Sequence, residues 1–196
     1  FSSLTHFIPI DPEDFFTDFL DGYHLNNGSN FSKNWFLEFE KSDENHIHYL
    51  SLSKWSDLKA HYLIQKQLNG KKVNLQMGNS TSVRYVQLFQ QQKGLKYNSN
   101  RGVSGIDGSS STAVGAASVT NELTVLITGD LSFIYDQHAL WNKEVPKNLK
   151  IIVVNNQGGG IFNIISGPKT TPYSKEFFET RHEISLEKIA ATFKIN

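Results

Sequence analysis

An α/β fold, with a parallel sheet flanked by helices on both faces, is predicted by two features of the 196-residue sequence. Continuous apolar runs of strand length alternate with segments in which apolar residues recur at helical spacing. The connections between these segments are short, which is typical of a parallel sheet that is buried on both sides. The predicted sheet strands lie at 72–77, 95–98, 123–128 and 150–155, and the predicted helices at 33–42, 53–68, 82–92, 106–119 and 133–145.

The composition fits a soluble globular protein, with 38% apolar and 19% charged residues. Basic and acidic residues number 19 each, so no bulk charge favours nucleic acid or an anionic membrane as a partner. No apolar run approaches the roughly 20 residues that span a bilayer. The absence of cysteine excludes disulfides and thiolate metal sites. It is also compatible with a reducing compartment, and we expect a cytoplasmic protein.

Three regions are predicted along the chain. The stretch "THFIPID" at 5–11 has the pattern of a short strand closed by Asp-Pro, and we assign residues 1–11 to the end of a preceding domain. Residues 12–30 are aromatic, acidic and then rich in Asn, Gly and Ser, which is typical of an interdomain linker. Residues 31–196 form the main domain, and we expect it to be truncated, because its last helical pattern is followed by no further strand.

Polar and glycine-rich residues follow each predicted strand of the sheet. The carboxyl ends of parallel strands share one edge, and ligands of such sheets bind outside that edge. We therefore expect these loops to lie close together and to form the functional site. The loops contain Gly78-Asn79-Ser80 with Arg84, Asn100-Arg101-Gly102, Gly129-Asp130-Leu131-Ser132, and Asn155 to Gly160.

Two oxygen-bearing side chains in these loops predict a metal site. Asp130, which we expect to be exposed, offers a carboxylate, and Asn156 offers an amide carbonyl. Hard oxygen ligands of this kind suit Mg²⁺ or Ca²⁺. The glycines after Asn156 allow the backbone to approach a ligand closely.

The predicted ligand of this edge is a metal-bridged diphosphate. Ser132 stands near the start of a predicted helix, where free N–H groups favour an anion. However, no Lys or Arg lies between Arg101 and Lys143, nor between Lys150 and Lys169. A divalent cation would therefore have to offset the charge of a bound phosphate. Taken singly, Gly-Asp before a helix and Asn-Asn before glycine are also ordinary capping and turn sequences.

Four motifs together resemble one enzyme family. "GNSTSVR" (78–84), "NRGVSGIDG" (100–108), "GDLSFIYD" (129–136) and "VVNNQGGGIF" (153–162) are similar, in this order, to the C-terminal domain of the 2-succinyl-5-enolpyruvyl-6-hydroxy-3-cyclohexene-1-carboxylate (SEPHCHC) synthases of menaquinone biosynthesis, the MenD family. These enzymes depend on thiamine diphosphate. The resemblance covers residues 78–162 and implies the diphosphate-binding domain of the thiamine-diphosphate fold.

The resemblance also implies roles for individual residues at the cofactor. Asp130, Asn156 and the Gly158 carbonyl would bind Mg²⁺ or Mn²⁺. Ile106 would be the apolar wedge that bends thiamine diphosphate into its reactive shape. The other cofactor-binding positions would be Gly129, Leu131, Ser132, Gly159 and Gly160.

The family decarboxylates 2-oxoglutarate and adds the succinyl unit to isochorismate. Both substrates are dianions, and arginine binds carboxylates with a pair of parallel hydrogen bonds. Ser80, Arg84 and Arg101 match the family's carboxylate-binding positions, and Ile161 and Phe162 would line the substrate site.

In the family, the cofactor lies between two subunits of a homo-oligomer, a dimer or a tetramer. The glutamate that activates the cofactor belongs to the first domain of the other subunit and is not in this chain, so we expect this chain alone to be inactive. Two alternatives remain open. They are another carboligase related to acetolactate synthase, which would not need both Arg84 and Arg101, and a non-catalytic anion-binding module, which would not need both Asp130 and Asn156.

Overall fold

The computed structural model describes residues 5–22, 30–142 and 144–195. The chain divides into two compact units, Phe1–Lys41 and Ser42–Asn196. This division falls inside the helix α2 (Phe31–Leu52), whereas the sequence-based boundary of the main domain lies at residue 31. The assignment of residues 1–11 to a preceding domain stays a prediction.

The N-terminal unit contains a helix where the sequence predicted a linker. The helix α1 (Pro12–Gly22) begins with proline, and the Asp11 carboxylate accepts a hydrogen bond of 2.9 Å from the Glu13 N–H. The strand predicted at 5–11 is wrong, because these residues form no strand in the structure. Pro9 lacks a backbone N–H, and no described segment pairs with these residues.

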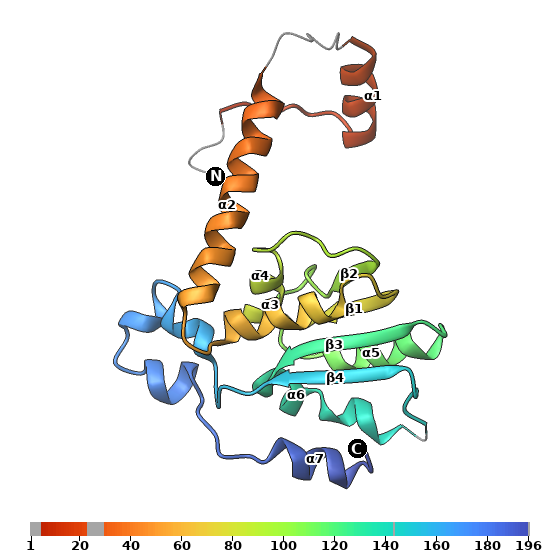
Figure 1. Ribbon diagram of the computed structural model, residues 1–196, viewed down its shortest axis with the longest axis vertical. Helices are drawn as coiled ribbons and strands as arrows, with labels where there is room; N and C mark the ends of the chain where they lie inside the picture. The colour runs from red at the N-terminus through yellow and green to blue at the C-terminus, as the bar shows by residue number, and fades with distance from the viewer. Residues whose placement is uncertain (1–4, 23–29, 143, 196) are drawn as a thin grey trace. The chain divides into compact units, whose positions relative to one another are not determined.

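The second unit is built on four parallel strands, which confirms the predicted fold class (Figure 1). The strand order is β2-β1-β3-β4. Register is continuous across the sheet, since Met77 lies opposite both Ser99 and Ile127. The strands are β1 (Val73–Met77), β2 (Leu95–Ser99), β3 (Leu123–Gly129) and β4 (Leu149–Val154).

Helices and short helical turns connect the strands. None of the helices in the described ranges combines the length and the hydropathy that a membrane crossing needs. The helix predicted at 133–145 is divided in two at Asp136. The buried carboxylate of Asp136 accepts hydrogen bonds from the N–H and the hydroxyl of Ser111. The elements are α3 (Asp57–Leu68), α4 (Thr81–Val86), α5 (Ser109–Ser118), α6 (Asp130–Tyr135), the 3₁₀ helices η1 (Gln137–Trp141), η2 (Gly160–Asn163) and η3 (Pro168–Thr170), the π-helix η4 (Ser174–Phe178) and α7 (Leu186–Thr192).

Alternate residues of the strands supply two apolar clusters, one on each face of the sheet. Val125 and Ile127 of β3 pack with residues of β1, α3 and α4. Leu126, between them in sequence, packs with Ala113 and Ala117 of α5 on the opposite face. This period of two follows from strand geometry.

The carboxyl ends of β1 and β3 approach each other at a glycine. The N–H of Gly78 donates to the Ile127 carbonyl at 2.8 Å. A Cβ at Gly78 would lie 2.8 Å from the Thr128 hydroxyl oxygen, which is closer than real Cβ contacts. Gly78 therefore permits the approach of the loops that follow these two strands.

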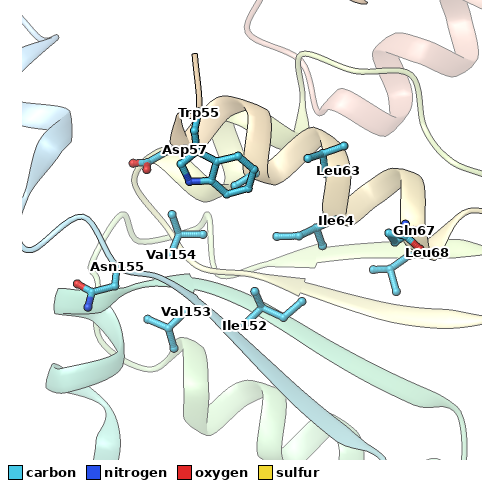
Figure 2. Close-up of a pocket in the computed structure, with 11 residues that line it drawn as sticks. Trp55, Asp57, Leu63, Ile64, Gln67, Leu68, Ile152, Val153, Val154 and Asn155 are labelled. Carbon is cyan, nitrogen blue, oxygen red and sulfur yellow. The ribbon is translucent and has the colours of Figure 1, made fainter. Parts of the chain in front are cut away.

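A separate apolar hollow of about 530 Å³ lies between α3 and β4 (Figure 2). Leu63 and Ile64 of α3 and Ile152 and Val154 of β4 contribute to its walls. It has few polar residues and lies against one face of the sheet, so it lacks the convergent polar groups that are found at the strand ends.

We expect Leu126→Ala to destabilise the domain by about 2–5 kcal/mol, because it removes a fully buried side chain and leaves a cavity. Chemical unfolding of the intact protein, followed by tryptophan fluorescence, measures this change. Val119→Ala is the control, since Val119 is 85% exposed and should change the free energy of unfolding by less than about 0.5 kcal/mol. Equal effects of the two substitutions would contradict the position of Leu126 in the core.

Candidate functional site

A hollow of about 400 Å³ lies at the carboxyl edge of the sheet. Its walls come from the loops that follow all four strands and from the start of α6. Every residue that the sequence analysis assigned to cofactor, metal or substrate lines this hollow: Ser80, Arg84, Arg101, Ile106, Gly129, Asp130, Leu131, Ser132, Asn156, Gly158, Gly159, Gly160, Ile161 and Phe162.

Asp130 begins α6 directly after β3, and its carboxylate is buried. The expectation of an exposed Asp130 is wrong, because only 2% of the residue is accessible. The N–H of Leu131 donates to Oδ1 at 2.7 Å, and the N–H of Gly158 donates to Oδ2 at 2.9 Å. The Gly158 contact joins the ends of β3 and β4 at this carboxylate.

His182 is a third partner of Asp130 that the sequence analysis did not identify. Its Nε2 lies 3.2 Å from Asp130 Oδ2. The N–H of Ile184 donates to Nδ1 of the same ring at 3.2 Å. Nε2 therefore carries the hydrogen and donates to Asp130. His182 is 52 residues away in a stretch without helical or strand periodicity, so no sequence pattern indicated this contact.

The glycines at 158–160 are required by close backbone contacts. The N–H of Gly159 donates to the Glu179 carbonyl at 2.6 Å. A Cβ on Gly158 would lie 2.7 Å from that carbonyl oxygen, and Gly158 has a φ of +152°. A Cβ on Gly159 would lie 2.8 Å from the Phe178 carbonyl. The segment after η4 thus packs directly on the glycine-rich loop.

Glu179 fixes this segment with its side chain as well as its backbone. Its buried carboxylate accepts hydrogen bonds from Arg181, at 2.9 Å, and from Asn163. The hydrogen bond from Arg181, followed by that from Asn163, holds the pKa of Glu179 below its usual range. Glu179 therefore connects η2 to the segment that covers the loop.

A hydrogen bond joins Ser132, in the first turn of α6, to Ile106, in the loop after β2. The Ser132 hydroxyl, which is 4% exposed, donates to the Ile106 carbonyl. This hydrogen bond fixes the backbone of the loop after β2 against the first turn of α6. The half-buried Ile106 side chain is thereby held at the wall of the hollow.

Asn79 organises the loop that carries Arg101. This buried side chain donates from Nδ2 to the carbonyls of Asn100, Val103 and Gly105, at 3.0, 3.2 and 2.6 Å. Arg101 Nη1 donates to Asn79 Oδ1 at 3.3 Å. The sequence analysis placed Asn79 on this edge but gave it no role. Thr81, Ser104 and Ile165 also line the hollow and were not identified from sequence.

Two arginines supply the positive charge of the hollow. Among its described lining residues, Arg84 and Arg101 are the ones with a permanent positive charge. Arg84 Nη1 donates to the Ser80 carbonyl at 2.8 Å. Ser80 itself has φ 73° and ψ −126°, a conformation that is sparsely populated for a residue with a side chain and is often found at functional sites.

The oxygen atoms at this edge fit a hard divalent cation. Asp130 offers carboxylate oxygens, Asn156 an amide oxygen and Gly158 a backbone carbonyl. A carboxylate has about four acceptor positions, so Asp130 retains capacity beyond its hydrogen bonds. Within the described ranges, no three His, Cys, Asp or Glu residues cluster in a way that could hold a metal. Oxygen donors of this kind suit Mg²⁺ or Mn²⁺ better than zinc, which prefers nitrogen and sulfur ligands.

A parallel sheet with polar, glycine-rich loops at its carboxyl edge is the architecture of a ligand-binding α/β domain. Residues 76–196 match the family described as thiamine pyrophosphate enzyme, C-terminal TPP binding domain. The chain belongs to this family.

Relatives identify the branch of the family that this chain resembles. A 2-succinyl-5-enolpyruvyl-6-hydroxy-3-cyclohexene-1-carboxylate synthase from Flavobacterium johnsoniae is 40% identical over 195 residues, which are 99% of this chain and 35% of the relative. The synthase of the same name from Christiangramia forsetii is 45% identical over 156 residues, 80% of this chain and 27% of the relative. The resemblance to the SEPHCHC synthases is therefore confirmed, and the chain spans about a third of the length of these relatives.

A solved structure supports the fold. The thiamine diphosphate-dependent 4-hydroxybenzoylformate decarboxylase of Rhodococcus jostii RHA1 superposes with a TM-score of 0.51, over 73% of this chain and 29% of that chain. The two sequences are 18% identical, so this likeness concerns the fold alone.

We expect Glu179→Gln to lower the melting temperature at neutral pH, because it weakens the hydrogen bonds to Arg181 and Asn163. The folded-state pKa of Glu179 is depressed. Its stabilising effect is therefore complete above the unfolded pKa, about 4.3, and is lost as the pH falls through the folded value. Thermal unfolding between pH 7 and pH 3 should show the two proteins converging at acid pH.

Glu183→Gln is the matched control, since Glu183 is exposed and makes no side-chain hydrogen bond or ion pair in the described part of the chain. It should leave the melting temperature close to that of the wild type. A difference between Glu179→Gln and wild type that stays constant with pH would contradict the ionic role of Glu179.

Proposed function

We propose that this chain is the diphosphate- and metal-binding domain of a SEPHCHC synthase. The intact enzyme would decarboxylate 2-oxoglutarate and add the succinyl unit to isochorismate in menaquinone biosynthesis. The names of the relatives support this reaction. The observation that carries the assignment to particular residues is that loops from all four strands converge on one hollow.

In this proposal, Asp130, Asn156 and the Gly158 carbonyl hold Mg²⁺ or Mn²⁺. The cation neutralises the diphosphate, which would otherwise meet no lysine or arginine from the loops at 129–132 and 155–160. The neighbouring cofactor positions at these loops are Gly129, Leu131, Ser132, Gly159 and Gly160. The hydrogen bonds from Leu131 and Gly158 to Asp130 support the role, because they fix the carboxylate before a cation binds.

Bound thiamine diphosphate supplies the chemistry that cleaves and forms carbon–carbon bonds next to a carbonyl group. Ile106 would serve as the apolar wedge against the cofactor, and the hydrogen bond from the Ser132 hydroxyl to the Ile106 carbonyl holds that residue at the wall of the hollow. Ile161 and Phe162 add apolar walls that exclude water from the same space. The activating glutamate is assigned to the first domain of a second subunit, so turnover is a property of the assembled protein.

Substrate carboxylates are assigned to Ser80, Arg84 and Arg101. Arg84 comes from α4 and Arg101 from the loop after β2, and both are exposed residues that line the hollow. Each presently donates to a neutral oxygen of the chain, and a carboxylate is a stronger acceptor for guanidinium than a neutral carbonyl. Two such cations suit the dianionic substrates of this reaction and are not needed for a small neutral acceptor.

We expect Asp130→Ala to abolish Mg²⁺-dependent binding of thiamine diphosphate in the intact protein, because Asp130 is the anionic ligand of the proposed site. Calorimetric titration of the cofactor with Mg²⁺ or with EDTA measures this. Asp130→Asn keeps the shape but removes the charge, so it should bind the cation more weakly than wild type while folding normally.

Asp107→Ala is the control, since Asp107 is an exposed acid of the neighbouring loop that does not line the hollow. It should retain wild-type binding. Unchanged cofactor affinity in both Asp130 variants would refute the metal assignment.

We expect Arg84→Ala and Arg101→Ala each to reduce kcat/KM for a dianionic substrate by roughly ten- to a hundredfold. A hydrogen bond to a charged group contributes about 1.5–3 kcal/mol, which corresponds to this range. Steady-state kinetics of the intact enzyme, together with calorimetry of the cofactor, separates substrate binding from cofactor binding. Cofactor affinity should be unchanged.

Lys147→Ala, which removes an exposed cation outside the hollow, should leave the kinetics at wild-type values. If either arginine variant also behaved as wild type, that arginine would be an ordinary surface charge.

A further inference from the structure

Asn156 has one long-range side-chain partner, the carboxylate of Asp57. Asn156 Nδ2 lies 2.8 Å from Asp57 Oδ2, across 99 residues of sequence. Asp57 is the first residue of α3, the helix that packs on the sheet, and Asn156 lies in the loop after β4. The contact therefore connects the proposed cation site to an element that lies outside the motif-bearing loops.

The chemistry of this contact fixes the orientation of the Asn156 amide. An ionised carboxylate only accepts hydrogen bonds, whereas an amide presents a donor, Nδ2, and an acceptor, Oδ1. The atom that faces Asp57 must therefore be Nδ2. Oδ1 is the other atom on the same carbon, so it is left free of Asp57, and oxygen is the atom that a hard cation binds.

Asp57 is itself well held. The preceding Ser56 caps α3, since its side chain accepts from the Lys59 N–H. The Asp57 carbonyl accepts from Nδ1 of the fully buried His61 at 2.7 Å. A negative charge is also favourable in the first turn of a helix. In Figure 2 the carboxylate of Asp57 points away from the apolar residues of the neighbouring hollow.

The glycine-rich loop leaves room for this arrangement. A Cβ at Gly160 would lie 3.1 Å from Asn156 Nδ2, which is tighter than most contacts of a real Cβ. Any larger residue at 160 would press on the same nitrogen that Asp57 binds. The glycine at 160 thus leaves the space that Nδ2 occupies beside Asp57.

We propose that Asp57 is a positioning residue for the divalent cation, acting by holding Asn156 Nδ2 so that Oδ1 is presented to the metal. The inference rests on the proposed function, since it takes Asn156 as a ligand of that cation. Asp57 does not touch the cation in this arrangement. Its effect passes entirely through the amide of Asn156.

The test is Asp57→Ala in the intact protein, with Mn²⁺ as the probe and thiamine diphosphate present. Free Mn²⁺ is followed by electron paramagnetic resonance, so binding is measured without reference to catalysis. Partners that orient metal ligands change metal affinity by about 10–100-fold. We expect a loss of about tenfold, the lower end of that range, because Asn156 is exposed.

Glu187→Ala is the matched control. Like Asp57, Glu187 lies in the first turn of a serine-capped helix, but it does not line the site hollow. It should change the melting temperature about as much as Asp57→Ala and leave Mn²⁺ affinity unchanged. Asp57→Asn should give an intermediate affinity, since a neutral amide at 57 can bind Asn156 in either orientation.

A double-mutant cycle shows whether Asp57 acts through Asn156. In an Asn156→Ala background, Asp57→Ala should cause no further loss of Mn²⁺ affinity. An equal loss in both backgrounds, or wild-type affinity in Asp57→Ala, would overturn the inference while leaving the proposed function intact. If the wild-type protein bound no Mn²⁺ with the cofactor, the proposed function and this inference would both be overturned.

Discussion

The parallel arrangement of β1 to β4 is the constraint on which the site depends. Helices cover one face of the sheet through Val125 and Ile127 and the other through Leu126, and the hollow that remains beside α3 is apolar. The strand ends are the remaining places where backbone and polar side chains can converge. Because all four strands point the same way, their loops meet at one edge, and the hollow forms there.

The strands could be predicted because they depend on local apolar patterns, whereas most of the candidate site residues were named from the resemblance of four motifs to the SEPHCHC synthases. Apolar runs predicted the strands β1 to β4, and glycine-containing motifs predicted the loops that follow them. The contact between the buried Asp130 and His182 could not be predicted, because His182 lies 52 residues away in a segment without periodicity. The contact between Asp57 and Asn156 could not be predicted either, because 99 residues of sequence separate them. The false strand at 5–11 shows the converse, since an extended pattern forms a strand only when it has a partner.

The site is organised mainly by the chain's own hydrogen bonds. The Asp130 carboxylate accepts hydrogen bonds from Leu131, Gly158 and His182, and the Glu179 carbonyl accepts one from the Gly159 N–H. These contacts come from residues on both sides of the glycine-rich loop. The glycines at 158–160 have no side chains whose packing could fix the loop. The loop therefore owes its shape to the segment at 178–182 as much as to the strand that precedes it.

β4 has a further consequence for handling this chain on its own. Its outer side carries backbone donors and acceptors that pair with no other strand in the described ranges, and the apolar hollow beside α3 adjoins it. An open strand edge next to exposed apolar surface is a template for pairing with another copy. We therefore expect concentrated solutions of this 196-residue chain to self-associate through β4, and a charged residue introduced on that edge to reduce this association.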